Sequence, residues 1–137
     1  MARLPYLDAA DLKPEDQGLL ARNINLHRVL VHNPEAARAF GTLGQYIRHH
    51  TRLDPRLREL AILQVGWQAR SPYEWSHHIK IGYDFGVTDA DIEALIADSE
   101  GRPNALEPAA KLVLQGTREI YEGAMSAGTF AALRRHL

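Results

Sequence analysis

The apolar positions of this chain recur mostly every three or four residues, which is the spacing of one face of an α-helix. Four such stretches begin with a capping residue followed by proline or by an acid in the first turn, at Asn33, Asp54, Ser71 and Thr88. The alternating pattern that strands require is scarce. The pattern therefore predicts an all-α fold of about six or seven helices joined by short connections.

The length and composition favour a single domain. A chain of 137 residues, 45% hydrophobic and 24% charged, is typical of a globular protein that buries its own core. We expect one helical domain over residues 1–137, with residues 1–12 as an extended N-terminal arm. A weaker helical pattern follows around residues 14–24.

Charge and cysteine content exclude several classes of function. The formal net charge of -1 gives no basic excess for binding nucleic acid. No apolar run approaches the roughly 20 residues of a membrane span, and the N-terminus lacks the apolar stretch of a signal peptide. We therefore expect a cytoplasmic protein without nucleic-acid or membrane partners. The chain has no cysteine, which excludes disulfide and thiolate chemistry.

The predicted helix over residues 55–70 has apolar residues around nearly its whole axis, so we expect it to be buried. Glu59 lies on this helix, on the stripe shared with Ile62 and Leu63. A lone carboxylate there would be desolvated, which raises its pKa. The alternative is a surface carboxylate near the helix start, paired with Arg56 or Arg58.

The stretch "SPYEWSHH" opens the second predicted central helix, residues 72–85. Ser71 and Glu74 have the S-x-x-E spacing of a capping box, and Pro72 stands in the first turn, where proline is best tolerated. A carboxylate in the first turn can also serve a functional site. We therefore expect Ser71 to cap the helix and leave the further role of Glu74 open.

His78 follows Glu74 by one helical turn, so the two side chains share a face. His77 is rotated away, onto the face of Tyr73. Glu74 and His78 could be an acid/base pair or two metal ligands. They could also be ordinary residues at the start of a helix with a solvent-exposed face. The chain has no H-x-x-x-H or H-E-x-x-H pattern, so we predict no metal site and keep a metal-dependent enzyme using this pair as an alternative.

The stretch 53–95 resembles the carboxymuconolactone decarboxylase family, which includes the alkylhydroperoxidase-D-like proteins. That family has a buried helix carrying a glutamate, a helix opening at C-x-x-C, a histidine, and a G-[VL]-[ST] turn. Glu59 matches the glutamate and His78 matches the histidine. Ser71 and Glu74 occupy the two cysteine positions.

The resemblance implies an alkylhydroperoxidase-D-like helical bundle built around the central helix pair, residues 55–70 and 72–85. It also implies a trimer or hexamer. The absent cysteines exclude a cysteine peroxidase, because serine cannot cycle through a disulfide. An acid at the second cysteine position is similar to the decarboxylase-type branch, in which a glutamate and a histidine are thought to transfer protons.

We therefore expect a cofactor-independent lyase or isomerase that uses general acid/base catalysis on a small carboxylate or lactone substrate. His78 is the expected acid/base, and Glu74 orients it or shares its proton. Glu59 is the second acid, with a raised pKa, or the hydrogen-bond anchor of the site. The candidates for substrate binding are Arg56, His77 and Tyr73.

One alternative is a small-molecule-binding or assembly module that keeps the fold without the chemistry. Assembly itself is expected, because one subunit can hardly cover a helix that is apolar on most sides. Residues 41–50 and 128–137 also share a weak sequence repeat, and the second copy lacks the helix that follows the first. We expect a closed homo-oligomer.

Overall fold

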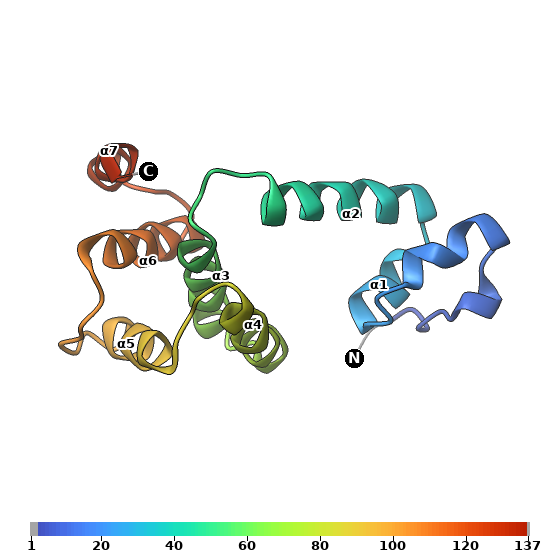
Figure 1. Ribbon diagram of the computed structural model, residues 1–137, viewed down its shortest axis with the longest axis horizontal. Coiled ribbons are helices and arrows are strands. Elements are labelled where there is room, and N and C mark those ends of the chain that lie inside the picture. The colour runs from blue at the N-terminus through green and yellow to red at the C-terminus, as the bar shows by residue number, and fades with distance from the viewer. Residues whose placement is uncertain (1–2, 137) are drawn as a thin grey trace. The chain divides into compact units, whose positions relative to one another are not determined.

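The structure is a computed structural model that describes residues 3–136 (Figure 1). These residues form seven α-helices and two short 3-10 helices, with no strand among them. The prediction of an all-α fold is confirmed. Contacts divide the chain into two compact units, Met1–Thr51 and Arg52–Leu137, and each is described by itself.

The first unit is short helices followed by one long helix. The helix expected around residues 14–24 is a 3-10 helix that ends at Leu20, and the expected extended arm contains a 3-10 turn. Asn33 accepts a hydrogen bond from the Ala36 N–H, as its capping role requires. The elements are η1 (Ala9–Asp11), η2 (Pro14–Leu20), α1 (Asn25–Leu30) and α2 (Pro34–His49).

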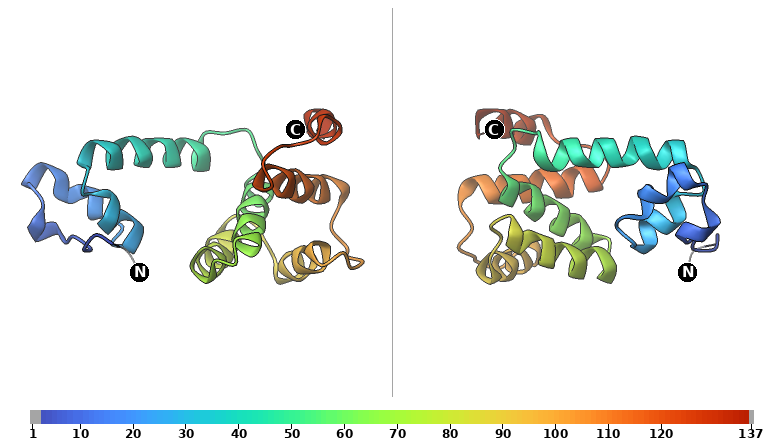
Figure 2. Two further views of the ribbon diagram at one scale, coloured as in Figure 1. Left: turned by 180° about the vertical axis from the view of Figure 1, so that it is seen from behind. Right: turned by 45° about the vertical axis from the view of Figure 1, so that its right-hand side comes forward.

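The second unit is organised around α3, which contacts α4, α5 and α6 (Figure 2). α7 packs on α6. The inner faces of these helices share a core of fully buried side chains: Leu60, Leu63, Leu95, Ala110 and Leu114. The helices are α3 (Pro55–Gln68), α4 (Pro72–Asp84), α5 (Asp89–Ser99), α6 (Pro108–Tyr121) and α7 (Ala127–His136).

Three of these helices, α3, α4 and α5, begin directly after the capping residues predicted from the sequence. Side-chain oxygens of Asp54, Ser71 and Thr88 each accept a hydrogen bond from the backbone N–H three residues later. α4 is followed by Gly86, whose φ of 88° is the left-handed conformation that glycine favours. These local signals explain why the boundaries predicted from the sequence agree closely with the observed ones.

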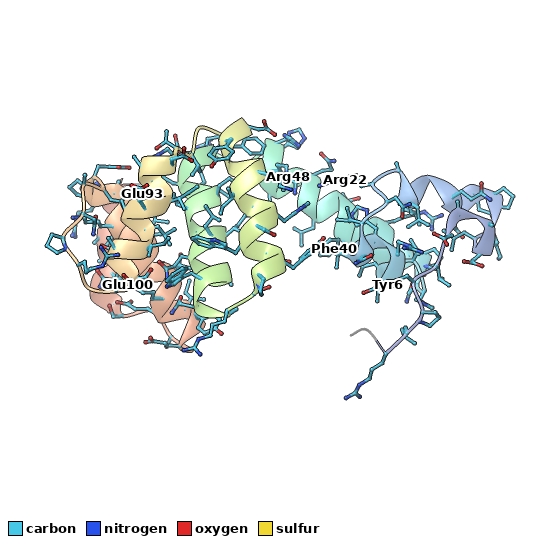
Figure 3. All side chains as sticks on the ribbon, turned by 90° about the horizontal axis from the view of Figure 1, so that it is seen from below. Tyr6, Arg22, Phe40, Arg48, Glu93 and Glu100 are labelled. Carbon is cyan, nitrogen blue, oxygen red and sulfur yellow. The ribbon has the colours of Figure 1, made fainter. Side chains whose placement is uncertain are left out.

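α3 and α4 lie side by side and pack closely (Figure 3). A Cβ added at Gly66 would lie 3.3 Å from the backbone nitrogen of Trp75, so a side chain there would force the helices apart. The indole rings of Trp67 and Trp75 meet 5.3 Å apart. Because the helices run in opposite directions, Glu59 near the start of α3 lies opposite His78 on α4.

Candidate active site

Glu59 is a buried carboxylate with two partners. It is 1% exposed, and its Oε2 lies 2.8 Å from Nδ1 of His78. Its Oε1 accepts a hydrogen bond from Nε of Arg58 at 3.1 Å. The alternative of a surface carboxylate is therefore wrong, although the pairing with Arg58 that it named is present.

The pKa of Glu59 is lowered, so the expectation of a raised pKa is wrong. Burial raises this pKa, but hydrogen bonds from His78 and Arg58, together with their charges, lower it more. The expectation failed because it treated Glu59 as a lone acid. At neutral pH Glu59 is an anchor that is ionised and can only accept hydrogen bonds.

This charge state decides the role of each nitrogen of His78. Because ionised Glu59 accepts, Nδ1 of His78 must be the donor in the 2.8 Å bond. Nε2 is then the nitrogen that gains and loses a proton, as in a carboxylate–histidine pair of a hydrolase triad. Glu59 holds the imidazole in one orientation and one tautomer.

Nε2 of His78 faces the second carboxylate. It lies 3.7 Å from Oε2 of Glu74, which is within ion-pair distance but too long for a direct hydrogen bond. The His78 side chain is 13% exposed and that of Glu74 is 48% exposed, so the two acids bracket the imidazole from the core side and the solvent side. Glu59, Glu74 and His78 meet in space, and their catalytic role stays a prediction.

Glu74 reaches His78 because it is not used as a cap. Ser71 Oγ accepts from the Glu74 N–H at 3.4 Å, but the Ser71 N–H donates to the carbonyl of Gly66 at 3.0 Å. Only half of the predicted capping box is therefore formed. Because the end of α3 satisfies the Ser71 N–H, the Glu74 carboxylate can face the imidazole.

Arg58 belongs to the site, although the sequence indicated it only as a partner of a surface Glu59. It is 6% exposed and its guanidinium lies 4.5 Å over the ring centre of Phe85. Neighbouring positions on a helix point in different directions, so helical spacing alone does not predict that Arg58 and Glu59 meet in the core. The length of the arginine side chain brings its head back to the carboxylate.

Tyr73 and His77 form a stack on the adjacent side of α4. Their ring centres are 5.5 Å apart and their planes differ by 9°. The ring of His77 also meets that of His78 edge-on, with centres 5.9 Å apart. His77 therefore lies beside the imidazole of His78, and Tyr73 lies behind His77 in the stack. Their role in substrate binding stays a prediction.

Arg56 is engaged in a structural clamp. Its Nε bonds Oδ2 of Asp91 at 2.9 Å and its Nη1 bonds Oε1 of Glu107 at 2.8 Å. These bonds raise the pKa of Arg56 and lower the pKa of both carboxylates. The clamp joins the starts of α3, α5 and α6 and occupies the guanidinium, so we do not carry Arg56 forward as a substrate ligand.

Two further observations concern the described residues as a whole. Between residues 3 and 136, no group of three histidine, aspartate or glutamate side chains is placed to hold a metal ion. Over the same range, no helix combines the length and the apolar character that crossing a membrane would need.

The lowered pKa of Glu59 predicts how stability depends on pH. A carboxyl whose folded pKa lies below its unfolded value contributes stability above the unfolded pKa, and that contribution is lost as pH falls through the folded pKa. We expect the difference in unfolding free energy between wild type and Glu59→Gln to be constant from about pH 5.5 to 7 and to shrink below about pH 4.5. Urea titrations across this range measure it, and a difference that shrinks toward pH 7 instead would indicate a raised pKa.

The cap of α4 gives a second prediction. Ser71→Ala removes the acceptor for the Glu74 N–H, and we expect the unfolding free energy to fall by about 1 kcal/mol. Ser76→Ala on the exposed side of the same helix is the matched control, with an expected change within about 0.5 kcal/mol. Thermal melts and turnover are measured on the same samples. Loss of turnover at wild-type stability would make Ser71 a reacting group instead.

Comparison with known proteins identifies the sequence region that carries this geometry. The carboxymuconolactone decarboxylase family matches residues 34–111, more than half of the chain. The match runs from α2 into α6 and includes Glu59, Glu74 and His78. No curated protein and no solved structure gives a significant match to the chain.

Proposed function

Because the chain belongs to the carboxymuconolactone decarboxylase family, we propose that it is a decarboxylase-type lyase or isomerase acting on a small carboxylate or lactone. The observation that carries the proposal is the Glu59–His78 hydrogen bond at 2.8 Å, with Glu74 facing the other ring nitrogen. An oriented imidazole between two carboxylates is suited to moving a proton to or from carbon.

The proposed reaction needs one proton at one carbon. When the bond to the carboxylate breaks, CO₂ leaves and the electron pair stays on the carbon, delocalised into a neighbouring carbonyl or lactone. Nε2 of the His78 imidazolium gives its proton to that carbon, which leaves the neutral imidazole. A proton from solvent, passed through half-exposed Glu74, then restores the imidazolium. Ionised Glu59 stabilises the imidazolium throughout. Because the substrate's own carbonyl takes up the electron pair, the proposal requires no cofactor.

The test uses carboxymuconolactone, the substrate in the family's name, together with related small lactone carboxylates. CO₂ release is followed at neutral pH with wild-type protein, with buffer alone, and with protein denatured beforehand. We expect release that scales with the concentration of folded protein. Binding of the lactone without turnover would favour the non-catalytic binding module.

We also propose that the protein is a homo-oligomer, most simply the trimer or hexamer that the family resemblance implies. α3 and α6 form an open apolar groove of about 430 Å³ in the second unit. Val65, Ile120 and Tyr121 along it are 42%, 62% and 50% exposed. An exposed apolar groove of this kind is typical of a contact surface. The residues that line it are Ala61, Ile62, Val65, Thr117, Ile120 and Tyr121.

A charge in the groove should weaken the assembly. We expect Ile120→Asp to shift the mass measured by light scattering toward a single chain at micromolar concentration, because it buries a carboxylate in an apolar contact. Ala131→Asp, on an exposed position of α7, is the matched control and should keep the wild-type mass. A wild-type protein that is already a single chain would contradict the proposal.

A further inference from the structure

A second hollow lies at the corner where α3 ends and α4 begins. Its volume is about 540 Å³, within the range of small-molecule sites. The two indole rings on its walls are 5.3 Å apart and tilted by 54°. It is lined by Trp67, Arg70, Ser71, Pro72 and Trp75.

Arg70 adopts a backbone conformation that its side chain disfavours. Its φ of 48° is in the left-handed region, and it is the only non-glycine residue between residues 3 and 136 with a positive φ. The Arg70 N–H donates to Trp67 O and the Ser71 N–H donates to Gly66 O, which is the Schellman ending of a helix. Glycine is the usual residue at this position because it has no Cβ to clash.

The charge of Arg70 is available to a ligand. The residue is exposed, and none of the ion pairs within the described part of the chain involves it. An arginine in the left-handed conformation, where glycine would be unstrained, indicates that the Arg70 side chain has a function at this position. That function would be to place a guanidinium beside the two indole rings of the hollow.

We propose that this hollow binds a planar aromatic carboxylate. The indole rings offer flat apolar surfaces to an aromatic ring, and a guanidinium binds a carboxylate through two parallel hydrogen bonds. Both features are needed together: the rings alone would accept any apolar group, and the exposed arginine alone would bind any anion weakly.

The hollow is distinct from the Glu59–His78 pair. None of the residues that line it belongs to that pair. Ser71, which caps α4, lies roughly 10 Å before His78 along the helix axis, while Trp75, on the near wall, lies three residues before it. The proposal does not depend on the proposed function, because its readout is binding. If the protein has no decarboxylase activity, the hollow and its arginine remain.

Intrinsic tryptophan fluorescence reports on this hollow. The chain has two tryptophans, and both line the hollow. The probes are benzoate, benzamide, which keeps the ring without the charge, and cyclohexanecarboxylate, which keeps the charge without the aromatic ring. We expect benzoate to change the tryptophan emission with a Kd on the order of 1 mM at constant ionic strength, and each control compound to bind at least about tenfold more weakly.

Two variants of Arg70 separate binding from folding. Arg70→Gly relieves the left-handed strain and removes the charge, so we expect a melting temperature equal to or above that of wild type and benzoate binding weakened at least about tenfold. Arg70→Lys keeps the charge but loses the pair of parallel hydrogen bonds, so its affinity for benzoate should lie between those of wild type and Arg70→Gly. His78→Ala should leave benzoate binding unchanged.

Several results would overturn the proposal. Benzamide binding as tightly as benzoate would show that the negative charge of the ligand does not contribute to binding. Arg70→Gly binding benzoate as wild type does would remove the arginine from the site. Loss of benzoate binding in a folded His78→Ala protein would place the ligand at the Glu59–His78 pair instead, and an emission spectrum that benzoate does not change would leave the hollow without this function.

Discussion

Replacing Glu59 with alanine is expected to lower the unfolding free energy by about 3 kcal/mol at pH 7, because it breaks a buried ion pair and leaves the guanidinium of Arg58 beside an empty space. The carboxylate is 1% exposed, so little solvent screens its two bonds. The same change frees the imidazole of His78 from its 2.8 Å anchor. Urea denaturation at constant pH measures the loss.

Glu93→Ala is the matched control, because Glu93 lies on an exposed position of α5 (Figure 3). The same chemical change there should alter the unfolding free energy by no more than about 0.5 kcal/mol. A loss at Glu59 as small as at Glu93 would mean that the buried pair contributes nothing to folding. The anchoring role assigned to Glu59 would then be wrong.

Replacing His78 with alanine is expected to reduce the rate of CO₂ release from carboxymuconolactone by roughly 100-fold to 10,000-fold, the usual contribution of one general acid. The loss should fall on kcat, since the proton is transferred in the transition state and not in the bound ground state. Steady-state kinetics on wild type and variant, with circular dichroism to confirm that both are folded, measures this effect.

Added imidazole distinguishes lost chemistry from lost structure. The His78→Ala change leaves a space beside Glu59 that a free imidazole can enter, and we expect it to restore part of the rate. His136→Ala removes an exposed histidine from the last turn of α7 and should retain the wild-type rate. Equal rates in His78→Ala and His136→Ala would place the acid/base elsewhere.

The helices and their starts could be predicted because their signals are local. Asp54, Ser71 and Thr88 each bond a backbone N–H three residues later, so the cap lies within one turn of its partner. Spacing along one helix likewise brought Glu74 and His78 together. The meeting of Glu59 with His78 followed from the short turn between two antiparallel helices.

The properties that depend on distant partners could not be predicted. Asp91 and Glu107 meet Arg56 from 35 and 51 residues away, so the sequence left that guanidinium as a candidate substrate ligand. The shift in the pKa of Glu59 was predicted with the wrong sign because the prediction treated Glu59 as a lone buried carboxylate. Hydrogen bonds from His78 and Arg58 outweigh the effect of burial, and the sequence does not give their strength. The left-handed backbone conformation of Arg70 could not be predicted from the sequence either.

In the first unit, the sequence pattern predicted a helix but not which type of helix forms. The pattern over residues 14–24 is compatible with helix, and the chain forms a 3-10 helix over Pro14–Leu20. Such a short segment makes few intrahelical hydrogen bonds, so its contacts with neighbouring elements decide between the tighter and the wider helix. α2, with a capping asparagine and proline in its first turn, begins where the sequence predicted.

The most direct test of the Glu59–His78 account is to run the decarboxylation of carboxymuconolactone in D₂O and locate deuterium in the product by NMR. If His78 delivers a solvent-derived proton to the carbon as CO₂ leaves, the wild-type product carries one deuterium at one carbon with a single stereochemistry. The His78→Ala variant should release CO₂ far more slowly and lose that stereochemical preference. Release at the wild-type rate by His78→Ala, with the same single deuterium on the same face, would contradict the account.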